Sequence, residues 1–390
     1  MPAHSPTVRI NPAVLKWARE SAGADLDETA KRLHTSAEIV AKWESGEEAP
    51  TFRNLEALAL FLRRPLAVFL LPKPPHEPPI PTDFRVLPGT QPALLSHKTR
   101  FAIRRAQRLQ RLTKDLLCEM GMEPVCSAGS ATLDSDPEKV AAAERKRLAV
   151  PVEEQGRWRN SGHAFSAWRS AVENLNILVF RFPMPLAETR GFSLTETNPP
   201  ALVVNSSDSV NARIFTLFHE YAHVLLRISG LCFFEESALR ENEAAERFCN
   251  QFSAAFLVPM DALLNDTRLA AAKNPSSLSD EALGAIAERF RVSKHVVWRR
   301  LAAANLVSSD AYWARVEKWK STGAVRYTRP KGGLRPARKC IEQRGRKFAS
   351  LVFEAKSRDI ITYRDMIDYL AVGPRHLRKV EHLLSEGRAR

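Results

Sequence analysis

The sequence predicts a mainly helical protein with a small β-sheet, an α+β fold. Two observations predict this class. Apolar residues recur three and four positions apart through most of the chain, which is the spacing of amphipathic helices. Short apolar runs that suit strands occur near the middle of the chain, at 176–180, 191–194 and 201–205. Their length suits strands, so we expect helical regions on both sides of a small central sheet.

The first region, residues 1–71, is predicted to be a bundle of short helices. Ser36 is a good N-cap and Gly46 is a good stop signal for the third of them. Six prolines within residues 72–81 then predict an extended spacer, and we place a linker at 72–92. Four helices are expected in this region. The first begins near Pro12, and the other three span about 26–33, 36–45 and 54–62.

Two further regions are predicted, a central domain over 93–330 and a basic helical tail over 331–390. A weak boundary at Lys331-Gly332-Gly333 separates them. In the central domain we expect a long basic helix at 93–120, a helix from about 134 to 147, and a helix followed by a strand over 163–181. We expect several more helices after Asn211 and three helices over 335–382.

The composition excludes some classes of protein. At 390 residues the chain can form two or three domains with buried cores. No run of about eighteen apolar residues is present, and the amino terminus lacks a signal-type apolar segment. The five cysteines are scattered without a CxxC pair, which disfavours a disulfide framework or a zinc ribbon. We therefore expect a cytoplasmic protein without a membrane partner.

The charge is strongly positive and unevenly distributed. The net charge is +14, which favours an acidic partner. Residues 1–72 are neutral, whereas 97–114 hold seven basic residues and no acid, and 331–390 hold fifteen basic and seven acidic residues. These basic stretches are interpreted either as solvated helix faces or as surfaces for nucleic acid.

The stretch His219-Glu220-Tyr221-Ala222-His223 carries the strongest chemical signal. Histidines four apart on a helix project from one face and can bind one zinc ion. Glu220 stands where a carboxylate can take a proton from a zinc-bound water. Such a site needs a third protein ligand, and the following segment offers Glu241, Glu243 and Glu246.

Residues 215–223 (FTLFHEYAH) and 246–259 (ERFCNQFSAAFLVP) together resemble the ImmA/IrrE family of metallopeptidases, which shows an FTLxHExxH helix followed by an ExxxNxFAAxxLxP helix. The resemblance implies a zincin-like metallopeptidase domain with one bound Zn²⁺ and with Glu246 as the third ligand. Glu243 is the alternative ligand, and Mn²⁺ or Fe²⁺ also suits a His2Glu site. Cys249 stands where alanine is frequent, and we expect it to pack as a small apolar residue.

The resemblance extends to the segments before this helix. Residues 191–194 and 200–205 are similar to the paired strands of that family, and in peptidases of this kind an edge strand binds extended substrate through its backbone. No residue stands out as the donor that stabilises the oxyanion. Tyr221 is expected to pack inward, and His163 and His295 are weak candidates.

Residues 30–46 resemble an Xre-type helix-turn-helix, although Leu26 and His34 replace its frequent glutamine and turn glycine. Residues near the amino end of a recognition helix read DNA bases. The alternative is a module that docks a protein or dimerises. The residues that match the core pattern are Ala30, Leu33, Ile39 and Trp43. The candidate DNA contacts are Ser36, Ala37 and Lys42.

These resemblances imply a cytosolic zinc endopeptidase fused to a helix-turn-helix domain. Proteins of this kind cleave a repressor or antitoxin and so switch on genes of stress response, mobile elements or phage defence. The alternative is a transcription regulator or antitoxin that uses the metallopeptidase fold as a sensor or interaction surface. A weaker hypothesis is activation by nucleic acid bound at 97–114 or at the tail.

Overall fold

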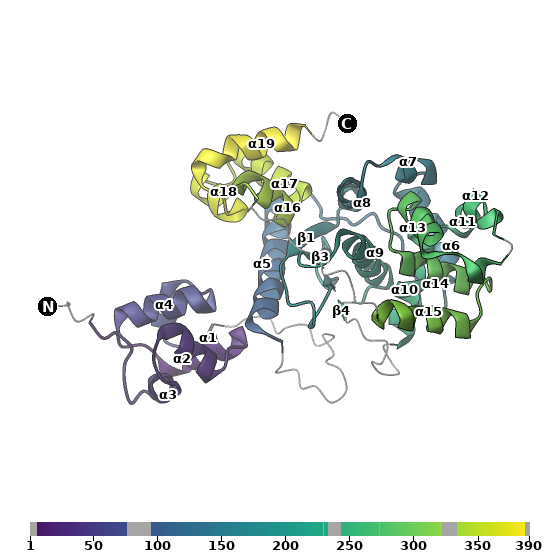
Figure 1. Ribbon diagram of the computed structural model, residues 1–390. Helices are drawn as coiled ribbons and strands as arrows, with labels where there is room; N and C mark the ends of the chain where they lie inside the picture. The colour runs from purple at the N-terminus through teal and green to yellow at the C-terminus, as the bar shows by residue number, and fades with distance from the viewer. Residues whose placement is uncertain are drawn as a thin grey trace. The chain divides into compact units, whose positions relative to one another are not determined.

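The structure is a computed structural model that describes residues 6–75, 95–228, 230–232, 243–272, 274–321 and 334–386. The chain forms two compact units, residues 1–105 and 106–390. The described residues are mainly helical with one small sheet, which confirms the predicted fold class (Figure 1). Most of the proline-rich linker and the Lys331-Gly332-Gly333 boundary lie outside the described residues. The domain limits at 71, 92 and 330 stay predictions.

The first unit begins with a small helical bundle around its own apolar core. Its central feature is a pair of helices, α2 and α3, joined by a turn in which His34 has a left-handed backbone with φ of 55°. Ser36 caps α3, and Gly46 ends it with φ of 83°. The guanidinium of Arg19 on α1 donates two hydrogen bonds to Glu44 on α3, at 2.7 and 2.8 Å. The elements are α1 (Pro12–Ala22), α2 (Leu26–Leu33), α3 (Ala37–Ser45), α4 (Phe52–Leu62) and the 3-10 helix η1 (Leu66–Leu70).

The basic helix α5 (His97–Glu119) confirms the long helix expected at 93–120. One face buries apolar side chains such as Ile103 and Leu109. Two of its arginines bind backbone rather than solvent, because Arg100 donates to the carbonyl of Leu95 and Arg104 to that of Leu62. Some of the basic residues at 97–114 therefore have a structural role.

The second unit contains a four-stranded sheet of order β1-β3-β2-β4 among the described residues. β1 runs parallel to β3, whereas β2 is antiparallel to both β3 and β4. The strands expected at 191–194 and 200–205 pair with each other as the resemblance implied, but among the described residues neither is an edge strand, because β1 pairs with β3 and β4 pairs with β2. The strands are β1 (Leu178–Phe182), β2 (Gly191–Leu194), β3 (Ala201–Asn205) and β4 (Gly230–Cys232).

Helix α9 (Val210–Leu226) packs against β2 and β3, and α10 (Glu243–Leu257) packs along α9 (Figure 1). Helix α6 (Pro137–Arg147) contacts α10 and bonds to both helices. Glu144 of α6 accepts the hydroxyl hydrogen of Tyr221 on α9. Arg145 of α6 donates to the carbonyl of Phe256 on α10 at 2.6 Å. α6 therefore fixes the two central helices relative to each other.

The remaining helices of the central region enclose the same core. α13 and α14 form a packed pair whose apolar faces include Leu283 and Val297. These helices are α7 (Val152–Arg157), α8 (Ser161–Asn174), α11 (Met260–Leu264), α12 (Thr267–Ala270), η3 (Pro275–Ser277), α13 (Asp280–Arg289), α14 (Lys294–Ala303) and α15 (Ser309–Ser321).

The tail forms four α-helices over its described residues rather than the three expected. Gly345, with φ of 86°, separates the first of these helices from the second. The tail packs on the central region, since Arg169 donates to the carbonyl of Glu342 at 2.8 Å. These elements are α16 (Pro336–Arg344), α17 (Arg346–Ser357), α18 (Tyr363–Leu370), η4 (Pro374–His376) and α19 (Leu377–Ser385). No described helix has the length and apolarity that crossing a membrane requires.

Candidate metal centre

The two motif histidines lie one turn apart on α9 and face each other. Ser209 caps this helix by accepting from the amide of Ala212, so its first turn is well defined. The Nε2 atoms of His219 and His223 are 3.3 Å apart, and both side chains are buried. Donors at about 2.0–2.1 Å from a tetrahedral zinc ion are roughly 3.3–3.4 Å from each other. The spacing of the two rings therefore fits one shared ion.

Glu246 of α10 completes the set of donors. Its Oε2 lies 3.2 Å from Nε2 of His219, and its Oε1 lies 3.3 Å from Nε2 of His223. Both distances again match the ligand-to-ligand spacing of a tetrahedral site. Glu243, the alternative ligand, is the first residue of α10, and its side chain lies outside the described part of the chain. The structure thus brings His219, His223 and Glu246 together.

The protonation states of these groups suit metal binding. Burial lowers the pKa of His223, and its hydrogen bond with Glu246 opposes this shift without reversing it. Burial alone would raise the pKa of Glu246, but hydrogen bonds with His219 and His223 lower that pKa below its ordinary value. A neutral imidazole and an ionised carboxylate are the forms that bind a cation.

Glu220 projects beside the histidines and is completely buried. Neither of its carboxylate oxygens has a hydrogen-bond partner among the described residues. Burial raises the pKa of Glu220 well above its usual value, and the charge of Glu246 adds to this shift. Ser193 lowers the pKa of Glu220 and so opposes this shift, although the Ser193 hydroxyl does not form a regular hydrogen bond with the carboxylate. A buried carboxyl group without a partner either stays protonated or has its charge compensated by a cation, and a metal ion held by the neighbouring donors would supply that cation.

Gly191 on β2 lets the sheet approach the helix that carries Glu220. A Cβ atom at this position would lie 2.5 Å from Cγ2 of Thr216 and 2.8 Å from the carbonyl oxygen of Val203. It would also lie 3.2 Å from Oε1 of Glu220. The motif did not reveal this role, because the contact depends on how β2 packs across α9.

We expect Gly191→Ala to destabilise the protein by about 1–3 kcal/mol, because the added methyl group overlaps backbone and packed side-chain atoms. Urea unfolding followed by circular dichroism measures this change. Gly373→Ala is the matched control, since a Cβ atom there meets nothing within 4 Å. Equal midpoints for the two variants would contradict the close approach.

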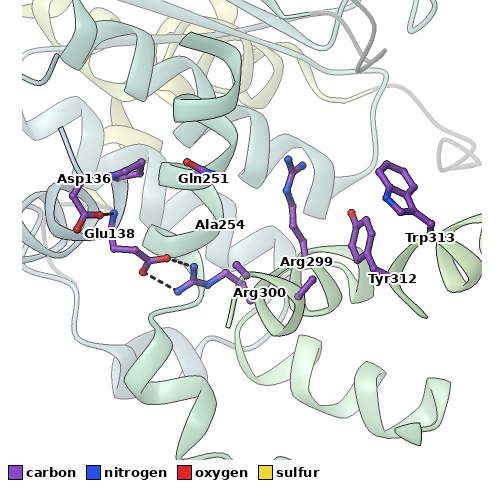
Figure 2. A pocket seen from close by; sticks show the side chains of 11 residues that line it. Asp136, Glu138, Gln251, Ala254, Arg299, Arg300, Tyr312 and Trp313 are labelled. Atoms are coloured by element: carbon purple, nitrogen blue, oxygen red, sulfur yellow. Dashed lines mark hydrogen bonds and ion pairs between the residues drawn. The ribbon is translucent and has the colours of Figure 1, made fainter. Parts of the chain in front are cut away.

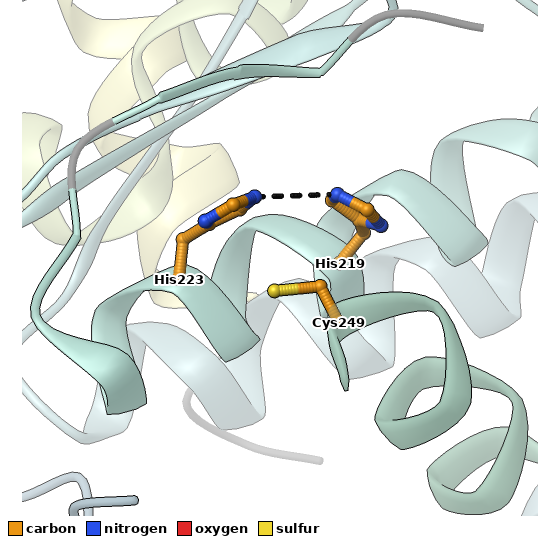
Figure 3. Close-up of side chains that lie close together, drawn as sticks. All are labelled: His219, His223 and Cys249. Carbon is orange, nitrogen blue, oxygen red and sulfur yellow. Dashed lines mark hydrogen bonds between the residues drawn. The ribbon is translucent and has the colours of Figure 1, made fainter. Parts of the chain in front are cut away.

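Cys249 also lies at this site. It is fully buried on α10, and its sulfur lies within 4.8 Å of a ring nitrogen of each histidine. Figure 3 shows the sulfur beneath the facing rings of His219 and His223. Burial raises the pKa of the Cys249 thiol, and the nearby carboxylates of Glu246 and Glu220 raise it further. The expectation that Cys249 packs as a small apolar residue is confirmed, since it belongs to the buried core, and the sequence did not reveal that its sulfur lies close to the two histidine rings.

The weak candidates for an oxyanion donor do not join this cluster. Tyr221 is buried and donates its hydroxyl hydrogen to Glu144, which confirms that it packs inward. His295 stacks edge-on against Trp319 with ring centroids 4.5 Å apart. His163 is exposed on α8.

A separate cavity of about 450 Å³ lies between α6, α10, α14 and α15 (Figure 2). Its most buried cation, Arg300, is held by the carboxylate of Glu138. Its lining shares helix α10 with the metal centre through Gln251 and Ala254, but it includes none of the three ligand residues. The cavity is therefore distinct from the histidine cluster.

Of the candidate DNA contacts, Ser36 and Ala37 lie at the amino end of α3, whereas Lys42 lies in its last turn. Ser36 accepts from the amide of Ile39, so its hydroxyl is engaged in capping. Ala37 is half-buried. The ammonium of Lys42 lies 2.8 Å from the carboxylate of Glu48, and both side chains are about half exposed. Glu38, Glu47 and Glu48 give this surface a local excess of acidic groups.

Fold and site together define a helix-turn-helix protein with a metallopeptidase-like domain. Residues 172–302 match the family model described as the IrrE N-terminal-like domain, a peptidase family. Residues 15–69 match the model of a helix-turn-helix domain. The chain thus carries both domains, as the resemblances predicted. No curated protein and no solved structure matches it significantly.

Proposed function

We propose that this protein is a zinc-dependent endopeptidase whose ion is bound by His219, His223 and Glu246. The observation that carries the proposal is the spacing of these donors, 3.2–3.3 Å between neighbouring ligand atoms. It matches a tetrahedral zinc site with its fourth position left for a further ligand. The buried, unpartnered carboxylate of Glu220 beside the donors supports the same function.

A bound zinc ion would supply Lewis-acid activation of a water molecule and of a peptide carbonyl. Glu220 would accept the proton of the attacking water and pass it to the leaving nitrogen. Burial favours this role, because it raises the pKa of Glu220 and so makes the carboxylate a stronger base. Gly191 keeps the space in which the carboxylate lies.

We propose a cytoplasmic repressor- or antitoxin-like protein as the substrate, whose cleavage switches on stress, mobile-element or phage-defence genes. The helix-turn-helix domain supports this role, since a peptidase tethered to a DNA-reading fold acts where such a regulator is bound. Labelling of new protein amino termini in cells tests it. The wild type should produce cleavage sites that Glu220→Gln does not, and identical sets would exclude endopeptidase activity.

A second candidate is a regulator in which the helix-turn-helix domain docks a protein and the metallopeptidase fold senses a signal. The acidic surface around α3 favours it, because exposed carboxylates repel phosphates. The ion pair between Lys42 and Glu48 favours it too, since it occupies the one basic candidate contact. The two candidate functions predict different effects of Glu48 on DNA binding.

If the domain reads DNA, Glu48→Gln should strengthen binding to a fragment of the gene's own promoter, because it frees Lys42 for a phosphate. One additional phosphate contact steepens the slope of log affinity against log salt by about 0.9. Fluorescence anisotropy at two or more salt concentrations measures both effects. Glu56→Gln on α4 removes an equal charge away from α3 and serves as the control. Equal affinities for the two variants would favour the protein-docking candidate.

A further inference from the structure

Cys249 has a position that packing alone does not explain. It follows Glu246 by three residues on α10, so both side chains lie on the face that meets α9. Its sulfur and one ring nitrogen from each of His219 and His223 lie within 4.8 Å of one another. Glu246 approaches the same rings from a more exposed position, with 32% of its side chain accessible, whereas Cys249 is fully buried. The sulfur therefore stands on the interior side of the ligand cluster.

We propose that Cys249 is a fourth protein ligand of the ion held by His219, His223 and Glu246. This inference rests on the proposed metal site and adds to it a ligand that belongs to this chain. The thiol loses its proton to solvent when the sulfur binds the ion. The buried, unpartnered carboxylate of Glu220 is the independent sign that the same pocket receives a cation.

Charge and geometry favour this ligand set. Two neutral imidazoles, one carboxylate and one thiolate would carry two negative charges, which match the two positive charges of the ion, and an ionised Glu220 beside them would add a third. Four protein donors also complete the tetrahedral coordination that zinc adopts in closed sites. A thiolate is a soft ligand, so the site should prefer Zn²⁺ to Mn²⁺ or Fe²⁺.

The ligand set has a consequence for the reaction. Four protein donors would fill a tetrahedral site, so the Cys249 thiolate would have to give up its place, taking up a proton, before the ion could activate water for peptide hydrolysis. The interior position of the sulfur leaves the more exposed side, next to Glu246, for the substrate.

Cobalt substitution and zinc X-ray absorption test the proposal without an activity assay. The full-length protein is loaded with Co²⁺ or with Zn²⁺, as wild type, Cys249→Ser and Cys249→Ala. Cys340→Ala is the matched control, because this buried cysteine lies on α16. We expect wild type and Cys340→Ala to show a near-ultraviolet thiolate-to-cobalt charge-transfer band and a zinc–sulfur distance of about 2.3 Å. Both Cys249 variants should lack these signals while they keep the visible cobalt bands of a His2Glu site.

The outcomes separate this inference from the function on which it rests. Bound cobalt with visible bands but no charge-transfer band in the wild type would overturn the role of Cys249 and leave the His2Glu site intact. A charge-transfer band that persists in Cys249→Ser would also overturn it. Failure of the folded wild type to bind either metal would overturn the metal site itself.

Discussion

Glu220→Gln is expected to lower peptide hydrolysis by a factor of about 10²–10⁴, because the amide cannot accept the proton of the attacking water. The variant should keep its metal, since Glu220 is not among the donors spaced 3.2–3.3 Å apart. It should also keep its fold, because glutamine has nearly the same shape and replaces a buried carboxylate that has no hydrogen-bond partner. Turnover of a fluorescence-quenched peptide library by equal amounts of metal-loaded protein measures the effect.

The control for this experiment is Glu154→Gln, which changes an exposed glutamate on α7. It should cleave the library at the wild-type rate. If Glu220→Gln retains wild-type turnover with full metal content, Glu220 is not the general base. Replacement of a buried carboxyl group that has no hydrogen-bond partner should leave the metal-free Glu220→Gln protein about as stable as the wild type, which thermal unfolding measures independently.

His223→Ala is expected to abolish tight metal binding, because it removes one of the three clustered donors. A ligand that binds only the folded state stabilises it by about 4 kcal/mol at a thousand times its dissociation constant. Excess zinc should therefore raise the unfolding temperature of the wild type by several degrees and leave that of His223→Ala unchanged. Differential scanning calorimetry with zinc and with a chelator measures both values.

His163→Ala provides the comparison for the histidine variant, since His163 is exposed on α8. Its unfolding temperature should respond to zinc as the wild type does. An equal response in His223→Ala would mean that zinc binds elsewhere on the chain.

The proximity of the two histidines was predictable from the sequence because they are related by helical periodicity. His219 and His223 lie four apart on one helix, and that spacing alone places their rings together. Glu246 was predictable only through the resemblance, since Glu241 and Glu243 have the same side-chain chemistry. The structure favours Glu246 through its contacts with both rings.

The features that the sequence did not reveal depend on contacts between distant segments. Gly191 matters because β2 crosses the helix that carries Glu220, and no local pattern encodes that crossing. β4 pairs with β2 and β1 pairs with β3, so neither of the two strands that the resemblance pointed to lies at the edge of the described sheet. The break at Gly345 lies where an added Cβ would overlap Glu173 of α8, so the tertiary contact favours glycine there.

The prediction of the helix-turn-helix was successful for a different reason. Its signals are capping residues and core spacing, which are local, and Ser36 and Gly46 act as predicted. The engagement of Lys42 by Glu48 was not predicted, because it depends on the turn after α3 folding back toward the helix. The fold of this domain was therefore easier to predict than its ligand.

The most direct test of the account is the metal content of the purified full-length protein, measured by mass spectrometry of the elements after zinc loading and dialysis. We expect about one zinc ion per chain in the wild type and in Glu220→Gln, and none in His223→Ala. A folded wild-type protein that retains no zinc would contradict it.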